Sequence, residues 1–335
     1  MGSPRLPIRS PFTTSSLTKI ALADMLGVQN AEVTRADAMK VAPIARGRGL
    51  ICGTLSRYPL TLWQLGATED QDVQLPTPSW MTSTKTLQSP ISRMLWTLDD
   101  LLFAGLSLWA VERDASGSIT DAARVDPSNW SVDPDSLGVL VNGAQVEDPR
   151  SVIVFEAPQE GLLTIADDAV RASRNLSKAW QRRVESPIPL ITLNQTDANA
   201  ELDDDEIDDA IDDLETARIN GATSFVPFGF QVQVHGDVKT DLFVEGRNAE
   251  RLDWGNYIGL PAAMLDGSMS TATLTYSTQE GKRSEFVDFS LFYWASAIEA
   301  RLSLDDVTPP GACVRFNLKW LANPTQQTTN ALTED

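Results

Sequence analysis

The amino-acid sequence predicts an α+β fold, in which helices and clusters of short antiparallel strands share one chain. Apolar residues recur at helical spacing in several segments, most clearly in 165–184 and 241–258. Between 122 and 155, short apolar runs alternate with Asp, Pro and Gly, which is typical of small antiparallel strands. With 335 residues and 42% apolar content, the chain is long enough to bury a substantial core.

The first half of the sequence begins with an arm, residues 1–16, that is rich in Pro, Ser, Thr and Arg and is expected to be extended. Gly27 is a stop signal for the first helix, and Pro43 suits the first turn of the second. Helices are expected over 17–26, over 36–57 and from 91 towards 111, and strands over 60–63, 130–132, 139–141 and 152–155.

The second half of the sequence repeats helical spacing more often. Pro187 and Pro189 end the first of these helices, and a polar tail follows from Asn323. Helices are expected over 165–184, 203–215, 241–258 and 279–302, and strands over 188–193, 225–234 and 314–321.

The net charge of −19 disfavours a protein that grips nucleic acid tightly, because phosphate binding depends on clustered Lys and Arg. An acidic channel wall would instead repel duplex DNA from every side and let it slide. An acidic surface that only maintains solubility explains the same charge. The sequence shows neither a membrane-length apolar run nor a signal peptide, which favours a soluble cytosolic protein.

The sequence offers no recognisable catalytic constellation, so no enzyme activity, cofactor or metal is expected. The single histidine, His235, stands in a strand-like run without nucleophile or metal-ligand partners. Gly47, Gly49 and Gly53 follow no strand, and Cys52 stands where a dinucleotide loop needs glycine. Cys52 and Cys313 have no metal-ligand spacing and are expected to be buried free thiols.

An acidic run from Asp203 to Asp213 is expected to begin a helix. Asp203 and Glu206 fit a capping box, and acidic side chains favour the positive end of a helix dipole. The alternative is a divalent metal site, and with it a metal-dependent hydrolase. The run lacks the glycine and the alternate-residue acids of a calcium loop, which weighs against that alternative.

Two segments of the sequence resemble the portal protein family of long-tailed bacteriophages. The first is Val41–Trp63, a helix with small residues followed by a strand after Pro59. The second is Asp241–Leu302, in which a helix, Ile258-Gly259-Leu260-Pro261, a Ser/Thr-rich loop ending in Tyr276-Ser277, Gln279-Glu280-Gly281 and a second helix follow in the family's order. The intervening segments fit the order of elements, so the resemblance spans most of the chain.

The resemblance implies the phage portal fold, which has a wing, a two-helix stem, a small α/β clip and a tunnel loop. The crown that many portal proteins also have is expected to be short or absent here. Carried onto this sequence, it implies an N-terminal arm over 1–16, the wing over 17–164 and 279–322, stem helices over 165–185 and 239–259, the clip over 186–238, the tunnel loop over 260–278 and a polar tail over 323–335.

The resemblance implies that the tunnel loop lines the narrowest part of the channel. Small hydroxyl side chains suit that place, because they contact phosphates weakly and exchangeably. Its candidate lining residues are Met264, Ser268, Met269, Ser270, Thr271, Thr273 and Thr275. The acidic clip helix is the expected contact for a packaging motor or an adaptor, through Asp204, Asp205, Asp208, Asp209 and Asp212.

The resemblance further implies a virion protein that assembles in the host cytoplasm and forms the portal vertex. Its implied partners are identical subunits in a dodecamer, double-stranded DNA in the channel, the terminase large subunit, the head-tail adaptor, the major capsid protein and the scaffold. A head-tail adaptor is the other alternative function. In a closed ring, the acidic faces need basic partners such as Arg182, Arg183, Arg247 or Arg251.

Overall fold

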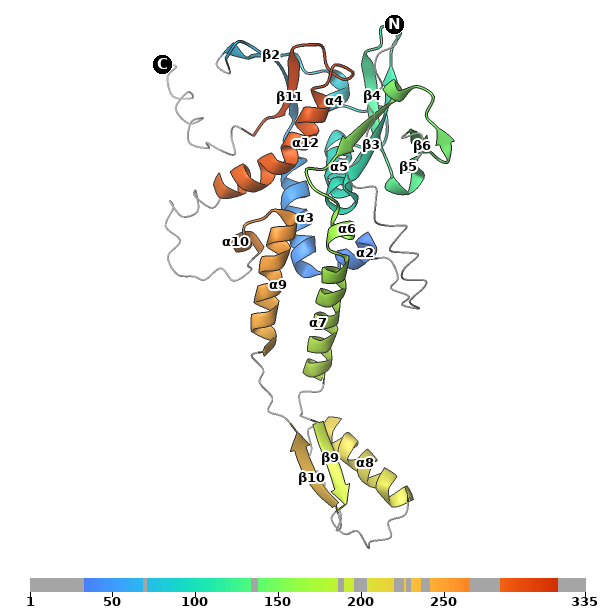
Figure 1. Ribbon diagram of the computed structural model, residues 1–335, viewed down its shortest axis with the longest axis vertical. Coiled ribbons are helices and arrows are strands. Elements are labelled where there is room, and N and C mark those ends of the chain that lie inside the picture. Colours follow the sequence, from blue (N-terminus) through green and yellow to red (C-terminus); the bar gives the residue numbers. More distant parts are fainter. Residues whose placement is uncertain are drawn as a thin grey trace, which may run out of the picture. The chain divides into compact units, whose positions relative to one another are not determined.

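The structure is a computed structural model that describes residues 33–68, 71–133, 138–185, 190–195, 204–219, 226, 230–235, 242–265 and 284–318 (Figure 1). The arm at 1–16, the helix expected at 17–26 and the tail from 323 lie outside these residues. The chain divides into a larger unit, Met1–Arg171 with Arg251–Asp335, and a smaller unit, Ala172–Glu250.

The larger unit contains three antiparallel sheets of three strands each among its described residues. Their strand orders are β11-β1-β2, β4-β3-β8 and β5-β6-β7. The strands are β1 Leu60–Gln64, β2 Val73–Leu75, β3 Leu106–Arg113, β4 Ile119–Val125, β5 Trp130–Val132, β6 Val139–Val141, β7 Ala144–Gln145, β8 Val152–Glu156 and β11 Ala312–Phe316. The runs predicted at 130–132, 139–141 and 152–155 are β5, β6 and β8, so these predictions are confirmed.

Helices pack against these sheets and against one another. The helical elements of the larger unit are α2 Arg35–Ala38, α3 Ala42–Leu55, α4 Ser79–Thr82, α5 Pro90–Ala104, α6 Leu162–Ile165, α10 Ala262–Leu265 and α12 Phe292–Leu302, with short 3₁₀ turns at Pro127–Asn129 and Pro149–Ser151. Pro43 lies in the first turn of α3, as predicted. Figure 1 shows α3 and α5 side by side, and α12 packs against β11 and β8.

The prediction that the third helix runs on towards Val111 is wrong, because Gly105 ends it. Gly105 adopts the left-handed conformation with φ of 80°, and its N–H donates to the carbonyls of Asp100 and Leu101. A Cβ at this position would lie 2.9 Å from the backbone nitrogen of Gly161. The residues after Gly105 therefore start a new element, β3, whose side chains alternate between buried and exposed at its far end.

The long helix predicted over 279–302 is interrupted in its described part. A π-helical segment, Phe286–Leu291, precedes the regular α12. Trp294 and Ile298 of α12 are fully buried, and the Trp294 Nε1 donates to the carbonyl of Ile258 at 3.3 Å. A π-helical turn adds a residue to the helical repeat and shifts the face that follows it. Hydrophobic spacing alone does not reveal such a shift.

The core of the larger unit forms where α3 meets α5, α12 and the end of α9 (Leu242–Ile258). Ile44, Ile51 and Leu55 of α3 are buried, and Gly47 lies on the same side. A Cβ on Gly47 would lie 2.9 Å from Ile258 Cδ1 and 3.0 Å from Leu260 Cδ1. Gly47 is therefore a close-approach position of the α3 packing face.

Among its described residues, the smaller unit contains a two-stranded antiparallel sheet, one complete helix and parts of two others. β9 (Leu190–Gln195) pairs with β10 (Phe230–His235), and α8 spans Asp204–Ile219. α7 (Asp167–Glu185) leads into this unit and α9 leads out of it. The helices predicted at 165–184, 203–215 and 241–258 are confirmed as α7, α8 and α9. The predicted strands at 188–193 and 225–234 are present with shifted ends, because β9 begins at Leu190 and β10 at Phe230.

We expect Gly47→Leu to lower the midpoint of thermal unfolding, because an added side chain must enter a filled interface. Overpacking of this kind costs about 1–3 kcal/mol. Gly49→Leu on the same helix is the matched control, since Gly49 is exposed and an added Cβ meets no atom within 4 Å. Equal unfolding midpoints for the two variants, measured by circular dichroism, would contradict the close packing at Gly47.

Candidate functional site

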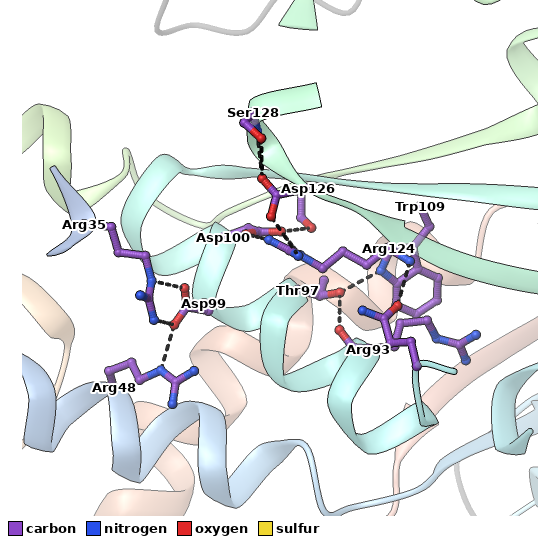
Figure 2. Close-up of polar contacts among 12 residues, drawn as sticks. Arg35, Arg48, Arg93, Thr97, Asp99, Asp100, Trp109, Arg124, Asp126 and Ser128 are labelled. Carbon is purple, nitrogen blue, oxygen red and sulfur yellow. Dashed lines mark hydrogen bonds and ion pairs between the residues drawn. The ribbon is translucent and has the colours of Figure 1, made fainter. Parts of the chain in front are cut away.

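Two adjacent carboxylates on α5, Asp99 and Asp100, form the most highly charged buried site among the described residues (Figure 2). Their residues are 1% and 4% exposed, in a helix whose neighbouring positions Leu98, Leu101 and Leu102 are part of the core. Buried carboxylates are costly unless charged partners and hydrogen bonds compensate them. Their partners therefore determine what this site does.

Asp99 is held by two arginines from the helices that precede α5. Arg35 Nε donates to Asp99 Oδ2 at 2.6 Å and Arg35 Nη2 to Oδ1 at 2.8 Å, while Arg48 Nε donates to Oδ1 at 2.7 Å. The hydrogen bond with Asp99 raises the pKa of Arg35. The bidentate contact from Arg35 links α2 to α5, and the single hydrogen bond from Arg48 links α3 to α5.

Asp100 makes the equivalent connection to the sheet. Arg124 of β4 donates from Nε and Nη2 to the two oxygens of Asp100, both at 2.6 Å, and Ser107 Oγ donates to Oδ2 at 2.8 Å. Arg124 also lies 3.7 Å from Asp126 Oδ2. Neighbouring side chains on one turn of α5 thus bind elements on two sides of the helix.

The ring of Trp96, one turn before Asp100 on α5, lies within reach of three guanidinium groups. The centres of Arg35, Arg48 and Arg124 are 5.2, 5.6 and 5.5 Å from its centroid. Cation–aromatic attraction adds to the ion pairs at this distance. The ring remains 36% exposed, so it covers the outer side of the charged cluster without sealing it.

Arg93, two turns before Asp100, carries a second buried charge that backbone carbonyls compensate. Its guanidinium donates to the carbonyls of Ala122, Trp80 and Met81, and lies 4.6 Å from the centroid of Trp109. Burial lowers the pKa of Arg93 to about 10, so the group stays charged at neutral pH. It fixes α4 and β4 against α5.

The geometry of this cluster is that of a structural lock. Each of the carboxylate groups of Asp99 and Asp100 accepts charged hydrogen bonds from arginine, which leaves neither poised to move a proton or bind a ligand. Sequence analysis missed the cluster. The available signal was a pair of consecutive Asp residues inside an otherwise apolar helix, which demands buried basic partners.

The sequence-predicted channel residues lie mostly outside the described part of the chain. Of the seven, only Met264 is described, in α10, where its half-buried side chain packs against the core. Ser268, Met269, Ser270, Thr271, Thr273 and Thr275 fall within 266–283 and are not described. Their place in a channel stays a prediction.

The described elements on either side of that loop are fixed to each other. Gly259, with φ of 72°, ends α9, and Tyr293 of α12 donates to the carbonyl of Pro158 at 3.3 Å. Gln159 Nε2 in turn donates to the carbonyl of Tyr257 at 2.8 Å. The segments that enter and leave the loop therefore belong to one folded region.

The predicted acidic helix is present as α8, and four of its five candidate contact residues are described with their side chains. Asp205, Asp208, Asp209 and Asp212 are exposed, while Asp204 is the first residue of the helix. Ala210 is buried on the opposite side, but Ile211, expected in the same buried stripe, is 42% exposed. The acidic face points to solvent, available to a partner.

The structure gives the metal-dependent hydrolase alternative no support. Within the described ranges, no group of three or more His, Cys, Asp or Glu side chains is arranged to hold a metal ion.

His235 ends β10, opposite Leu190. Cys52 is a buried free thiol as expected, whereas Cys313 is only half-buried because it alternates outward on β11. In the described part of the chain, no helix has the length and apolar character to cross a membrane.

Comparison with solved structures finds a close relative. The crystal structure of an HK97 family phage portal protein from Corynebacterium diphtheriae is 33% identical in sequence and superimposes with a TM-score of 0.71. The match covers 87% of this chain and 97% of that one. No protein-family profile matches the chain, and no curated protein matches it either.

More distant structures share the fold. A chain from the virion of a native gene transfer agent particle is 14% identical, with a TM-score of 0.59 and coverage of 96% of this chain and 97% of that one. A chain from the neck of the native particle, computed with C12 symmetry, is 13% identical, with a TM-score of 0.57 and coverage of 90% of each chain.

Asp99→Ala is expected to destabilise the larger unit by about 3 kcal/mol or more, because it leaves Arg35 and Arg48 without their carboxylate. The midpoint of thermal unfolding measures the loss. Glu112→Ala is the control, since Glu112 pairs with Lys85 at the surface and should leave the midpoint unchanged. A loss no larger for Asp99→Ala than for the control would show that the cluster is not a structural lock.

Proposed function

Because the chain belongs to the HK97 family of phage portal proteins, we propose that it assembles into a closed ring at one vertex of a phage capsid and conducts double-stranded DNA. The observation that carries this proposal is the 33% identity with a portal protein over 87% of the chain. The match covers 87% of this chain, and the unmatched part is smaller than either unit, so the match reaches both units.

The elements support the division into portal modules. The wing corresponds to the described parts of 17–164 and 279–322, which contain the three sheets and the α5 lock. The stem helices, 165–185 and 239–259, correspond to α7 and α9. The clip, 186–238, corresponds to β9, β10 and α8, and the tunnel loop to 260–278. The C12 symmetry applied to a structurally similar neck chain is consistent with a dodecamer.

We assign no catalytic step to the chain. The described charged groups with the deepest burial are committed to ion pairs and backbone carbonyls. The energy for DNA movement then comes from a separate motor, the terminase large subunit, that docks on the ring. The remaining partners are the head-tail adaptor, the major capsid protein and the scaffold. The ring assembles in the host cytoplasm and stays in the virion.

The charge of the chain fits a passage for DNA better than a holding site. A net charge of −19 opposes the counterion-releasing grip that Lys and Arg clusters make on phosphates. Within the tunnel loop, Ser and Thr side chains offer weak hydrogen bonds to phosphate oxygens that exchange as the duplex moves. The loop then guides DNA without retaining it.

The acidic face of α8, defined by Asp205, Asp208, Asp209 and Asp212, is the proposed docking contact of the clip. These four side chains are exposed on one helix. Ala210, on the opposite side of the helix, is buried within the smaller unit. A concentrated negative face attracts a basic partner surface and speeds its docking. Successive binding of motor and adaptor requires such an exchangeable contact.

Replacing Ser268, Ser270 and Thr271 together with Lys is expected to slow or stall DNA packaging while rings still form. Three added cations per subunit convert a weak phosphate contact into a strong one. An in vitro assay of nuclease-protected DNA in capsids measures packaging, and electron microscopy counts rings.

The triple Ala variant at the same three positions is the control, because it changes the loop without adding charge. It should package more DNA than the Lys variant. Normal packaging by the Lys variant, with normal rings, would remove the loop from the channel wall.

Replacing Asp205, Asp208, Asp209 and Asp212 with Asn is expected to weaken binding of the terminase large subunit or the adaptor and to flatten its salt dependence. Asn keeps the side-chain shape and removes the charge. Binding to immobilised rings at low and moderate salt measures the effect. Glu112→Gln, in an exposed surface pair of the larger unit, is the control. Unchanged affinity for both partners would place their docking surface elsewhere.

A further inference from the structure

The helix pair α7 and α9 has an inner side that is defined by a stacked contact. The Arg247 guanidinium of α9 lies 4.9 Å from the ring centroid of Trp180 on α7. On α7, Ser173 is buried and Leu176 half-buried on the same side as Trp180. On α9, Trp254 and Ile258 are buried and lie on the Arg247 side. The opposite sides of both helices therefore face away from the pair.

The outward side of α7 is basic. Successive residues of an α-helix are rotated by about 100° around its axis. Arg174, Lys178 and Arg182 therefore point, on average, about 160° away from Trp180, almost directly opposite the inner side. Lys178 and Arg182 are exposed. We name these three residues the basic face of α7. The acidic residues of α7 near this side are Asp167 and Asp168 of the first turn, and both pair with Arg171.

The outward side of α9 is acidic and partly apolar. Five exposed residues of α9 point between about 120° and 180° away from Arg247 around the helix axis. They are Glu245, Ala249, Leu252, Asp253 and Asn256. This side carries two carboxylates, Glu245 and Asp253, and Leu252 is 54% exposed. Both arginines of α9, Arg247 and Arg251, lie on the inner side instead. We name Glu245 and Asp253 the acidic face of α9.

The two faces have matching positions along the helices. The chain enters the smaller unit along α7 and leaves it along α9, so the helices run in opposite directions. Arg182 lies two residues beyond Trp180, and Glu245 lies two residues before Arg247, which puts both at one level. Lys178 lies two residues before Trp180 and Ala249 lies two residues beyond Arg247, so these two are also level with each other. Each helix pair thus presents opposite charges at the same height on its two flanks.

We propose that the basic face of α7 binds the acidic face of α9 of the next copy of this chain, in a head-to-tail interface. This inference rests on the proposed ring and names the surfaces that join it. A rotation axis parallel to the helices brings the two faces together without a change of height, so Arg182 meets Glu245 of the partner. Leu252, which is 54% exposed, is then covered near the Asp253 end of the contact. Unlike surfaces repeated around an axis without a change of height close into a ring when the rotation between copies divides a full turn.

DNA is the competing occupant of the basic face. Three cations on one helix suit phosphates as well as carboxylates. The matched acidic flank at the same level favours the second copy, because a DNA-facing stripe has no need of a complementary partner on the other helix. The experiments below separate the two occupants.

The first test is a cysteine cross-link between Lys178→Cys and Ala249→Cys in a Cys313→Ser background. Cys52 can remain, since burial raises the pKa of its thiol to about 12 and keeps it protonated. Mild oxidation of the double variant is expected to give a ladder of covalent oligomers on a non-reducing gel. Each single variant should run as a monomer on the gel, because the interface joins unlike faces and brings no two identical cysteines together. Trp180→Cys with Arg247→Cys lies on the inner side and should give no ladder.

The second test is a charge exchange. Arg182→Glu and Glu245→Arg are each expected to lower the fraction of protein in rings at low salt, and the double variant should restore it. Circular dichroism confirms that the variants are folded. Rings without a ladder, or a ladder from Lys178→Cys alone, would overturn the interface while leaving the portal function intact. Reduced DNA retention with unchanged ring assembly in Arg182→Glu would assign the basic face to DNA. Folded protein that forms no ring in any variant would overturn the portal function itself.

Discussion

The paired carboxylates of Asp99 and Asp100 are the interaction on which the larger unit depends. From a single turn of α5 they bind Arg35 and Arg48 on one side and Arg124 on the other, so three separate segments become one body. Charges buried this deeply are tolerated only with complete pairing, and partial pairing is worse than none. The lock therefore favours one arrangement of α2, α3 and β4 over looser packings of an otherwise apolar core.

That fixed body holds the ends of α7 and α9, the two proposed stem helices. The end of α9 packs closely against Gly47 of α3. Trp294 of α12 donates a hydrogen bond to the carbonyl of Ile258, the last residue of α9. The beginning of α7 joins the same core through Ala166 and Val170, which are buried. Both helices of the pair are thus anchored in the core of the larger unit. The exposed Lys178 and Arg182 of α7 and Glu245 and Asp253 of α9 carry the proposed contact with a second copy.

Much of this organisation could be predicted from local sequence, and the failures have identifiable causes. Helix periodicity located α7, α8 and α9 to within a few residues, and strand-length runs located β5, β6 and β8. The end of α5 was missed because the left-handed Gly105 interrupts an apolar run whose spacing looks continuous. The partners of Asp99 lie 64 and 51 residues away, a distance over which no local pattern operates. Among the candidate site residues, the acidic helix itself was predicted from its charge pattern and is present as α8. The contact role of its aspartates and the channel role of the residues within 266–283 stay predictions.

We propose that this chain forms a closed ring with a passage for DNA. Electron microscopy of the purified protein, with the ring symmetry determined from end-on views, tests that proposal most directly. Closed rings are expected, dodecameric when assembled as in the virion, with a central opening wide enough for a DNA duplex. A protein that stays monomeric, or that forms assemblies without a central opening under every assembly condition, would contradict it.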